Sequence, residues 1–196
     1  MGVYIEIKWY SRENEPISFS SVIVAEIMAG QGKFVQVFPG FCLHPSPPFN
    51  YGYTRISGNP IKLHRIFDPP DIIVIFNYSL ISLPNAAFNF KDTTNENTVF
   101  FVNTHLSPQE IKENLNTISK KIYTLDADSI TIQETGAKDP SIAISSLVVN
   151  YLENASIDII KQMFTPFLSR FWENGQVQSR LKIIERGINE VKIFKD

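Results

Sequence analysis

Two uninterrupted apolar runs constrain the fold of this chain more than any other feature of its sequence. Residues 72–76 read Ile-Ile-Val-Ile-Phe, and residues 99–102 read Val-Phe-Phe-Val. Each run has the length of a buried strand and is far shorter than the roughly 18 apolar residues that would span a membrane. Strands that are apolar on both faces belong to a parallel sheet covered by helices. We therefore expect a layered α/β domain.

The remaining patterns alternate between strands and helices. Period-two alternation and short apolar runs predict strands at residues 3–9, 34–38, 51–56, 61–66, 72–76, 99–102 and 122–125. Capping residues predict helices that begin at Ser18, Ser107, Asp126 or Asp128, Ser141 and Ser156, with a final helix at 181–191. This order predicts a three-layer, Rossmann-like domain with a mainly parallel sheet, helices on both faces and a C-terminal helical segment.

Two local signals set expected boundaries in more detail. Ser107, Pro108 and Glu110 have the spacing of a capping box. The helix that they start is expected to continue through Ile118. Residues 57–60 read Ser-Gly-Asn-Pro, a turn-forming quartet, so the strands on either side of it are expected to form a hairpin or to extend the sheet edge.

The C-terminal segment lacks strand signals after Tyr151. A helix is expected from Ser156 through Phe164, and Pro166 is expected to interrupt it because proline removes a helical hydrogen bond. We expect residues 1–196 to form a single domain, with the C-terminal helices 156–196 packed on it.

Charge and cysteine content exclude several classes of protein. Lys and Arg total 18 and Asp and Glu total 20, which gives a net charge of −2. This balance does not suit a protein that binds nucleic acid or an anionic membrane surface, so neither is an expected partner. Cys42 is the single cysteine and excludes an intrachain disulfide framework. A reducing, cytoplasmic setting is expected.

Most motifs that could bind a cofactor or metal are missing. Residues 11–16, between the first expected strand and helix, contain no glycine, although a dinucleotide-binding turn depends on it. Residues 30–33 include two glycines but follow a helix, which indicates a helix end. The three histidines lack metal-site spacing. Asp126 and Asp128 could pair as acid and base, but helix capping explains both more simply.

The proline-rich loop holds two further candidates. Cys42 and His44 lie two residues apart, so a stand-alone enzyme that uses Cys42 as its nucleophile stays open as an alternative. Loop 38–53 interleaves aromatic side chains with rigid prolines. Such a loop either folds back on its own domain or meets another chain, and we favour a partner interface.

The order of several short motifs resembles a known family. The motifs cover nearly the whole chain and are residues 38–41 (Phe-Pro-Gly-Phe), 53–56 (Tyr-Thr-Arg-Ile), 70–75 (Pro-Asp-Ile-Ile-Val-Ile), 103–104 (Asn-Thr) and 123–127 (Tyr-Thr-Leu-Asp-Ala). Their order and spacing resemble the gamma subunit, or gamma-type catalytic domain, of the pyruvate and 2-oxoacid:ferredoxin oxidoreductases.

The chain departs from this family in two loops. Of the family's Gly-Arg-Gly-Gly-Gln-Gly loop only Arg12 remains in place, and the arginine- and glycine-rich loop corresponds to residues 44–48, His-Pro-Ser-Pro-Pro. In the family these loops face neighbouring subunits and the cofactor region. The departures therefore weaken the expectation that this chain contacts substrate, coenzyme A or thiamine diphosphate directly.

The resemblance implies a gamma-type subunit that supports oxidative decarboxylation of a pyruvate-like 2-oxoacid to an acyl-coenzyme A. Its role would be mainly structural, without catalysis by the chain alone. Thiamine diphosphate, iron–sulfur clusters and coenzyme A are implied for the complex, and no cofactor for this chain by itself. The implied partners are the thiamine diphosphate-binding and ferredoxin-like chains, with ferredoxin reached through the complex. One cysteine agrees with this, since a cluster usually needs four thiolates.

Two arginines are the candidate contacts to a substrate or cofactor. Arg12 and Arg55 could each bind a carboxylate or phosphate through paired hydrogen bonds. Ion pairing with Glu13 or Glu15 is the alternative for these side chains. The alternative function is a non-catalytic paralogue of the subunit that acts as an interaction protein.

Overall fold

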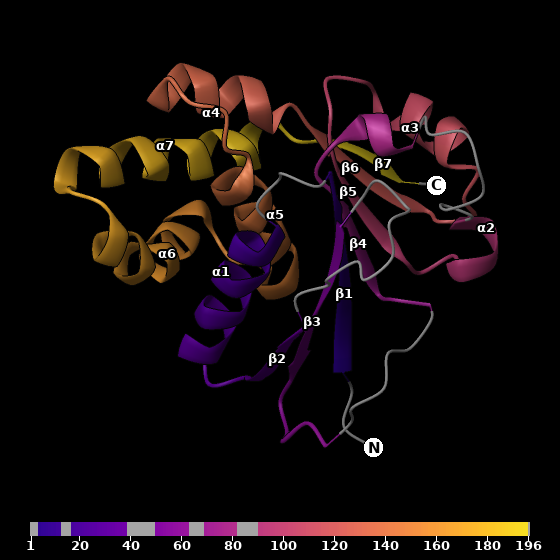
Figure 1. Ribbon diagram of the computed structural model, residues 1–196, viewed down its shortest axis with the longest axis horizontal. Coiled ribbons are helices and arrows are strands. Elements are labelled where there is room, and N and C mark those ends of the chain that lie inside the picture. The colour runs from indigo at the N-terminus through magenta and orange to yellow at the C-terminus, as the bar shows by residue number, and fades with distance from the viewer. Residues whose placement is uncertain (1–3, 13–16, 39–49, 63–68, 82–89, 196) are drawn as a thin grey trace.

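The protein, described here by a computed structural model, contains a single seven-stranded sheet within residues 4–12, 17–38, 50–62, 69–81 and 90–195 (Figure 1). The strand order is β2-β3-β1-β4-β5-β6-β7. The strands are β1 (Tyr4–Ser11), β2 (Phe34–Phe38), β3 (Asn50–Ser57), β4 (Ile72–Ile75), β5 (Val99–Asn103), β6 (Lys121–Leu125) and β7 (Lys192–Lys195).

The centre of the sheet is parallel and its margins are antiparallel. Strands β1, β4, β5 and β6 pair in parallel, whereas β3 is antiparallel to β1 and β7 is antiparallel to β6. Because β2 is antiparallel to β3, it points the same way as β1. Five of the seven strands therefore share one direction, and the expected mainly parallel sheet is confirmed.

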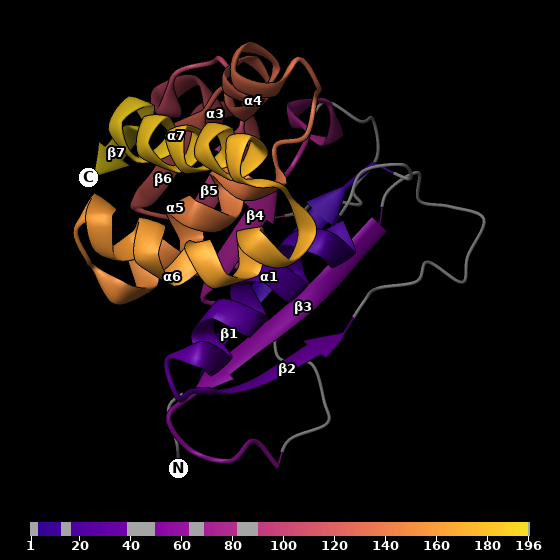
Figure 2. The ribbon, with the colours of Figure 1, turned by 90° about the vertical axis from the view of Figure 1, so that its left-hand side faces the viewer.

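Helices cover both faces of this sheet, as Figures 1 and 2 show. The helical segments are α1 (Ile17–Gly30), the 3₁₀ turn η1 (Tyr78–Leu80), α2 (Phe90–Thr93), α3 (Pro108–Leu115), α4 (Ala127–Thr135), α5 (Ser141–Glu153), α6 (Ile157–Phe171) and α7 (Asn174–Glu190). In Figure 1, α1, α5, α6 and α7 lie on one side of the sheet and α2 and α3 on the other.

The two apolar runs explain this layering. Ile72 and Val74 of β4 belong to the core beneath α1 and α5, whereas Ile73 and Ile75 belong to a second core that includes Ile111 of α3. Successive residues of a strand point to opposite faces, so an all-apolar strand requires cover on both sides. The three-layer α/β fold expected from the sequence is confirmed.

Helix α3 begins where the sequence predicts but ends earlier. Ser107 accepts a hydrogen bond from the amide of Glu110, whose carboxylate accepts one from the amide of Ser107, so the expected capping box is confirmed. The hydrogen bonds from Ser107 lower the pKa of Glu110, so the box weakens as pH falls through that pKa. The helix ends earlier than expected, because Asn116 adopts a left-handed conformation with φ of 47°. Ile118 is therefore outside the helix and 52% exposed.

Two expectations about the C-terminal segment are wrong. Pro166 lies inside α6 without ending it, since Phe164, Phe167 and Leu168 are buried on either side and hold the helix to the core. A strand was not expected after Tyr151, yet β7 pairs with β6 at the end of the chain.

The strand expected at residues 61–66 is described only at residues 61–62. Strand β3 pairs with β1 and β2, and residues 61–62 form no strand. Residues 63–66 lie outside the described part of the chain.

Among the residues that the structure describes, no helix is long and apolar enough to cross a membrane.

Three serine hydroxyl groups on α1 and α5 are buried without a hydrogen-bond partner. Ser20 of α1 and Ser141 and Ser145 of α5 are fully buried, and their hydroxyl groups have no hydrogen-bond partner in the structure. A buried hydroxyl without a partner costs about 1–3 kcal/mol of stability. Each of these serines is therefore expected to lower the stability of the fold.

We predict that Ser145→Ala raises the free energy of unfolding by about 1 kcal/mol, because it removes a buried hydroxyl that bonds to nothing. The matched control is Ser119→Ala, since Ser119 is equally buried but donates to the carbonyl of Thr98 at 2.6 Å. That change should lower the stability by about 1–2 kcal/mol. Urea denaturation measures both, and a loss of stability in Ser145→Ala would contradict the prediction.

Candidate functional site

The topology directs attention to one edge of the sheet. The carboxyl ends of β1, β4, β5 and β6 meet there because these strands are parallel. After β1 the chain passes through α1 to β2 on one side, whereas β4 lies on the other side of β1. In open α/β sheets, ligands bind outside the carboxyl ends of the strands where the strand order reverses. The candidate site is therefore the carboxyl end of the sheet between β1 and β4.

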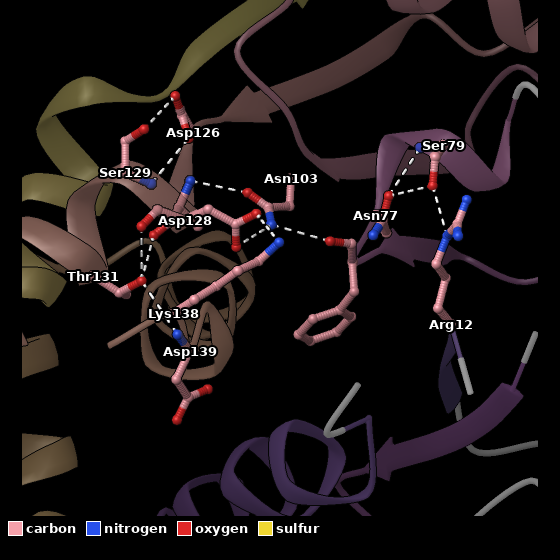
Figure 3. Close-up of polar contacts among 12 residues, drawn as sticks. Arg12, Asn77, Ser79, Asn103, Asp126, Asp128, Ser129, Thr131, Lys138 and Asp139 are labelled. Atoms are coloured by element: carbon pink, nitrogen blue, oxygen red, sulfur yellow. Dashed lines mark hydrogen bonds and ion pairs between the residues drawn. The ribbon is translucent and has the colours of Figure 1, made fainter. Parts of the chain in front are cut away.

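Arg12 links the carboxyl ends of β1 and β4 (Figure 3). It follows β1, is exposed, and donates from Nε to Oγ of Ser79 at 2.7 Å. Ser79 lies in η1 just beyond β4, and its hydroxyl donates to Oδ1 of Asn77 at 2.5 Å. The Asn77 side chain also accepts from the amide of Ser79 and so caps the turn. This chain of bonds orients the guanidinium across the ends of two strands.

A second group of bonds joins the ends of β4, β5 and β6. Asn103, the last residue of β5, is 4% exposed. Its Nδ2 donates to the carbonyl of Phe76 and to Oδ1 of Asp128, each at 3.0 Å. Its Oδ1 accepts from the amide of Ala127 at 3.0 Å. The Asn103 amide thus ties the loop after β4 to the start of α4 (Figure 3).

The two aspartates have different roles in this group. Asp126 caps α4 by accepting from the amide of Ser129 at 3.0 Å, so the capping interpretation is confirmed for this residue. Asp128 lies in the first turn, accepts from Asn103 and pairs with Lys138 at 2.9 Å. Both carboxylates are engaged in structural bonds, and the structure shows no acid–base pair formed between them.

The chemistry available at this edge is recognition of an anion. The guanidinium of Arg12 is exposed where the strand order reverses, and its Nε donates to Oγ of Ser79. Guanidinium groups bind carboxylate and phosphate with strong directional hydrogen bonds. Within the described residues, no group of three or more His, Cys, Asp and Glu side chains could hold a metal ion.

Arg55, the other candidate from the sequence, lies elsewhere. It is in β3, is 1% exposed, and donates from Nε to the carboxylate of Glu6 at 2.8 Å. Glu6 stands opposite it in β1, whereas Arg12 follows the far end of that strand. Six residues of strand separate the two positions, about 20 Å. The structure therefore does not bring Arg12 and Arg55 together.

Several candidates lie outside the described residues. These are Cys42 and His44, the glutamates Glu13 and Glu15, and residues 39–49 of the loop expected to form a partner interface. The predictions made for them stay predictions.

The sequence interpretation did not single out Asn77, Ser79 or Asn103 as site residues. A signal was present, since a polar residue directly follows each of the two apolar runs. The carboxyl ends of parallel strands meet at one edge, so such residues are expected to be neighbours.

Comparison with known proteins supports the family resemblance seen in the sequence. No protein-family model matches the chain. A curated relative, the common gamma subunit of the pyruvate/ketoisovalerate oxidoreductases of Pyrococcus furiosus, is 27% identical over 158 residues, which cover 81% of this chain and 83% of the relative. The family resemblance seen in the sequence is confirmed by such relatives.

Two solved structures share the fold. The crystal structure of the pyruvate oxidoreductase subunit PORC of Thermotoga maritima matches with a TM-score of 0.76 and 21% identity, covering 97% of this chain and 98% of that one. A 2-oxoglutarate:ferredoxin oxidoreductase of Magnetococcus marinus, solved with 2-oxoglutarate, coenzyme A and succinyl-CoA bound, matches with a TM-score of 0.63 and 18% identity. The match covers 95% of this chain and 30% of that chain.

We predict that Asn103→Ala lowers the free energy of unfolding by about 2–4 kcal/mol, because it removes three hydrogen bonds from a buried position. Asn150→Ala is the control, since its amide donates a single bond, to the carbonyl of Ala155 at 2.9 Å. The control should lose about 1 kcal/mol. Equal losses in urea denaturation would show that Asn103 does not join the strand ends as described.

Proposed function

This chain is a homologue of the gamma subunits of the pyruvate and 2-oxoacid:ferredoxin oxidoreductases, and from that premise we propose that it is the gamma-type subunit of such an enzyme. The observation that carries the proposal is the extent of the similarity, which runs through most of both chains. The proposed reaction of the complex is the oxidative decarboxylation of a 2-oxoacid to an acyl-coenzyme A. The chain contributes as one subunit and does not catalyse the reaction alone.

The chain's own residues support a division of labour among subunits. An iron–sulfur cluster usually needs four thiolates, and this chain has one cysteine. Its residues therefore do not fit a cluster, which we place on a ferredoxin-like partner chain. We place thiamine diphosphate on a second partner chain, with ferredoxin receiving the electrons from the complex. The proposed location is the cytoplasm.

Arg12 is the residue that we propose contacts an anion. It is exposed between the carboxyl ends of β1 and β4, where the strand order reverses, and Ser79 holds its guanidinium in place. The anion is either the carboxylate of the 2-oxoacid or a phosphate of coenzyme A, which share the same chemistry toward a guanidinium. We restrict the proposal to Arg12, since Arg55 is buried against Glu6 and joins β1 to β3.

A second function has support from the sequence. The glycine-rich loop of the family has been replaced around Arg12, so a non-catalytic paralogue that binds other proteins through the same fold is the second candidate. In both cases we propose that residues 1–196 form one domain with the C-terminal helices 156–196 packed on it.

The test is reconstitution of the complex from this chain and its partner chains. We predict that omission of this chain abolishes 2-oxoacid-dependent reduction of ferredoxin. We further predict that Arg12→Ala raises the KM for either the 2-oxoacid or coenzyme A by about tenfold, because it removes a charge-assisted contact. Measuring both KM values separates a carboxylate contact from a phosphate contact.

Arg170→Ala is the matched control, since Arg170 is also exposed but pairs with Glu26 of α1, away from the strand ends. It should leave both KM values unchanged. Full activity without this chain would contradict the subunit role. An assembled complex in which Arg12→Ala leaves both KM values unchanged would contradict only the role of Arg12.

A further inference from the structure

Strand β2 forms one margin of the sheet, as Figure 2 shows. It pairs with β3 on one side, and no described strand pairs with its other side. An edge strand of this kind presents unpaired amide and carbonyl groups that can pair with another chain.

Two backbone hydrogen bonds fix which residues of β1 pair with each neighbouring strand. The carbonyl of Glu6 accepts from the amide of Asp71 at 3.0 Å, and that of Tyr10 accepts from the amide of Phe76 at 2.9 Å. Backbone groups of successive residues point in opposite directions along a strand. The backbone amide and carbonyl groups of Glu6 and Tyr10 therefore point toward β4, and those of Ile7, between them, point toward β3.

The same alternation carries across β3 to β2. Ile7 stands opposite Thr54, so the backbone groups of Thr54 point toward β1. Those of the next residue, Arg55, point toward β2. Arg55 stands opposite Gln36, which must face β3 in return. The amide and carbonyl groups of Val35 and Val37 therefore point outward. In the described part of the chain they have no partner.

The two margins of the sheet differ in charge. Strand β7, at the other margin, carries Lys192 and Lys195, and lysines on an edge discourage pairing with another strand. Two copies of β7 paired about its centre would place Lys192 opposite Lys195. Strand β2 has neither a charged residue nor a proline, and Phe34 is 46% exposed. Lysines discourage strand pairing at the β7 margin, whereas the residues of β2 carry no charge that would do so.

The sequence of β2 is the same in both directions. It reads Phe-Val-Gln-Val-Phe and is symmetric about Gln36. Antiparallel pairing with a second copy about a two-fold axis at Gln36 would place Phe34 opposite Phe38, and Val35 opposite Val37. Every position then meets a residue of the same type, with no like charges opposed.

We propose that the outer edge of β2 is a self-association surface, where two copies of this chain pair antiparallel about Gln36 and join their sheets. The outward groups of Val35 exchange hydrogen bonds with those of Val37 of the second copy. Gln36 faces Gln36 of the second copy as a non-hydrogen-bonded pair, with Cα atoms about 4.5 Å apart. The inference does not rest on the proposed subunit function.

The test is disulfide trapping in the full chain with Cys42→Ser, which removes the native thiol. Gln36→Cys places two thiols on the two-fold axis within the Cα separation that a disulfide allows. Phe34→Cys is the control. Phe34 is more exposed than Gln36, but the proposed pairing sets it four residues along the strand from Phe34 of the second copy. Thermal melts monitored by circular dichroism confirm that both variants are folded.

We expect the Gln36→Cys protein to form covalent dimer at least about tenfold faster than the Phe34→Cys protein under mild oxidation. Sedimentation velocity of the unmodified chain should show a dimer that increases with concentration. Equal rates, or a faster rate for Phe34→Cys, would overturn the proposal. A monomer at all concentrations would also overturn it.

Discussion

The burial of β4 and β5 on both faces is the constraint on which the rest of this structure depends. All residues of both strands are buried, so neither strand can lie at a surface or at a margin of the sheet. They require parallel neighbours, helices above and below, and partners for the polar groups where each strand ends. Asn103 supplies such partners from a single amide, which bonds to residues following β4 and β6.

The candidate site follows from the same constraint. A sheet that is parallel at its centre gathers its polar residues at the carboxyl edge, and the change of direction between β1 and β4 places Arg12 beside Ser79. The surrounding hydrogen bonds orient the groups at this end of the sheet, and the guanidinium of Arg12 is exposed there. Such an arrangement suits recognition of an anion.

Much of the fold could be predicted from the sequence, because the signals for it are local. The apolar runs predicted β4 and β5, and Ser107 with Glu110 predicted the start of α3. Features set by distant contacts could not be predicted in this way. Arg55 is buried because the register of β1 and β3 places it opposite Glu6, 49 residues away. Pro166 is tolerated because buried neighbours hold α6 in place, and β7 exists through its pairing with β6.

We propose that this chain functions within a larger oxidoreductase. The most direct measurement is the size and iron content of the protein purified from its native source. We expect the chain to co-purify with other subunits in an iron-containing complex much larger than its own 22.3 kDa. A colourless species of 22.3 kDa without associated chains would contradict it.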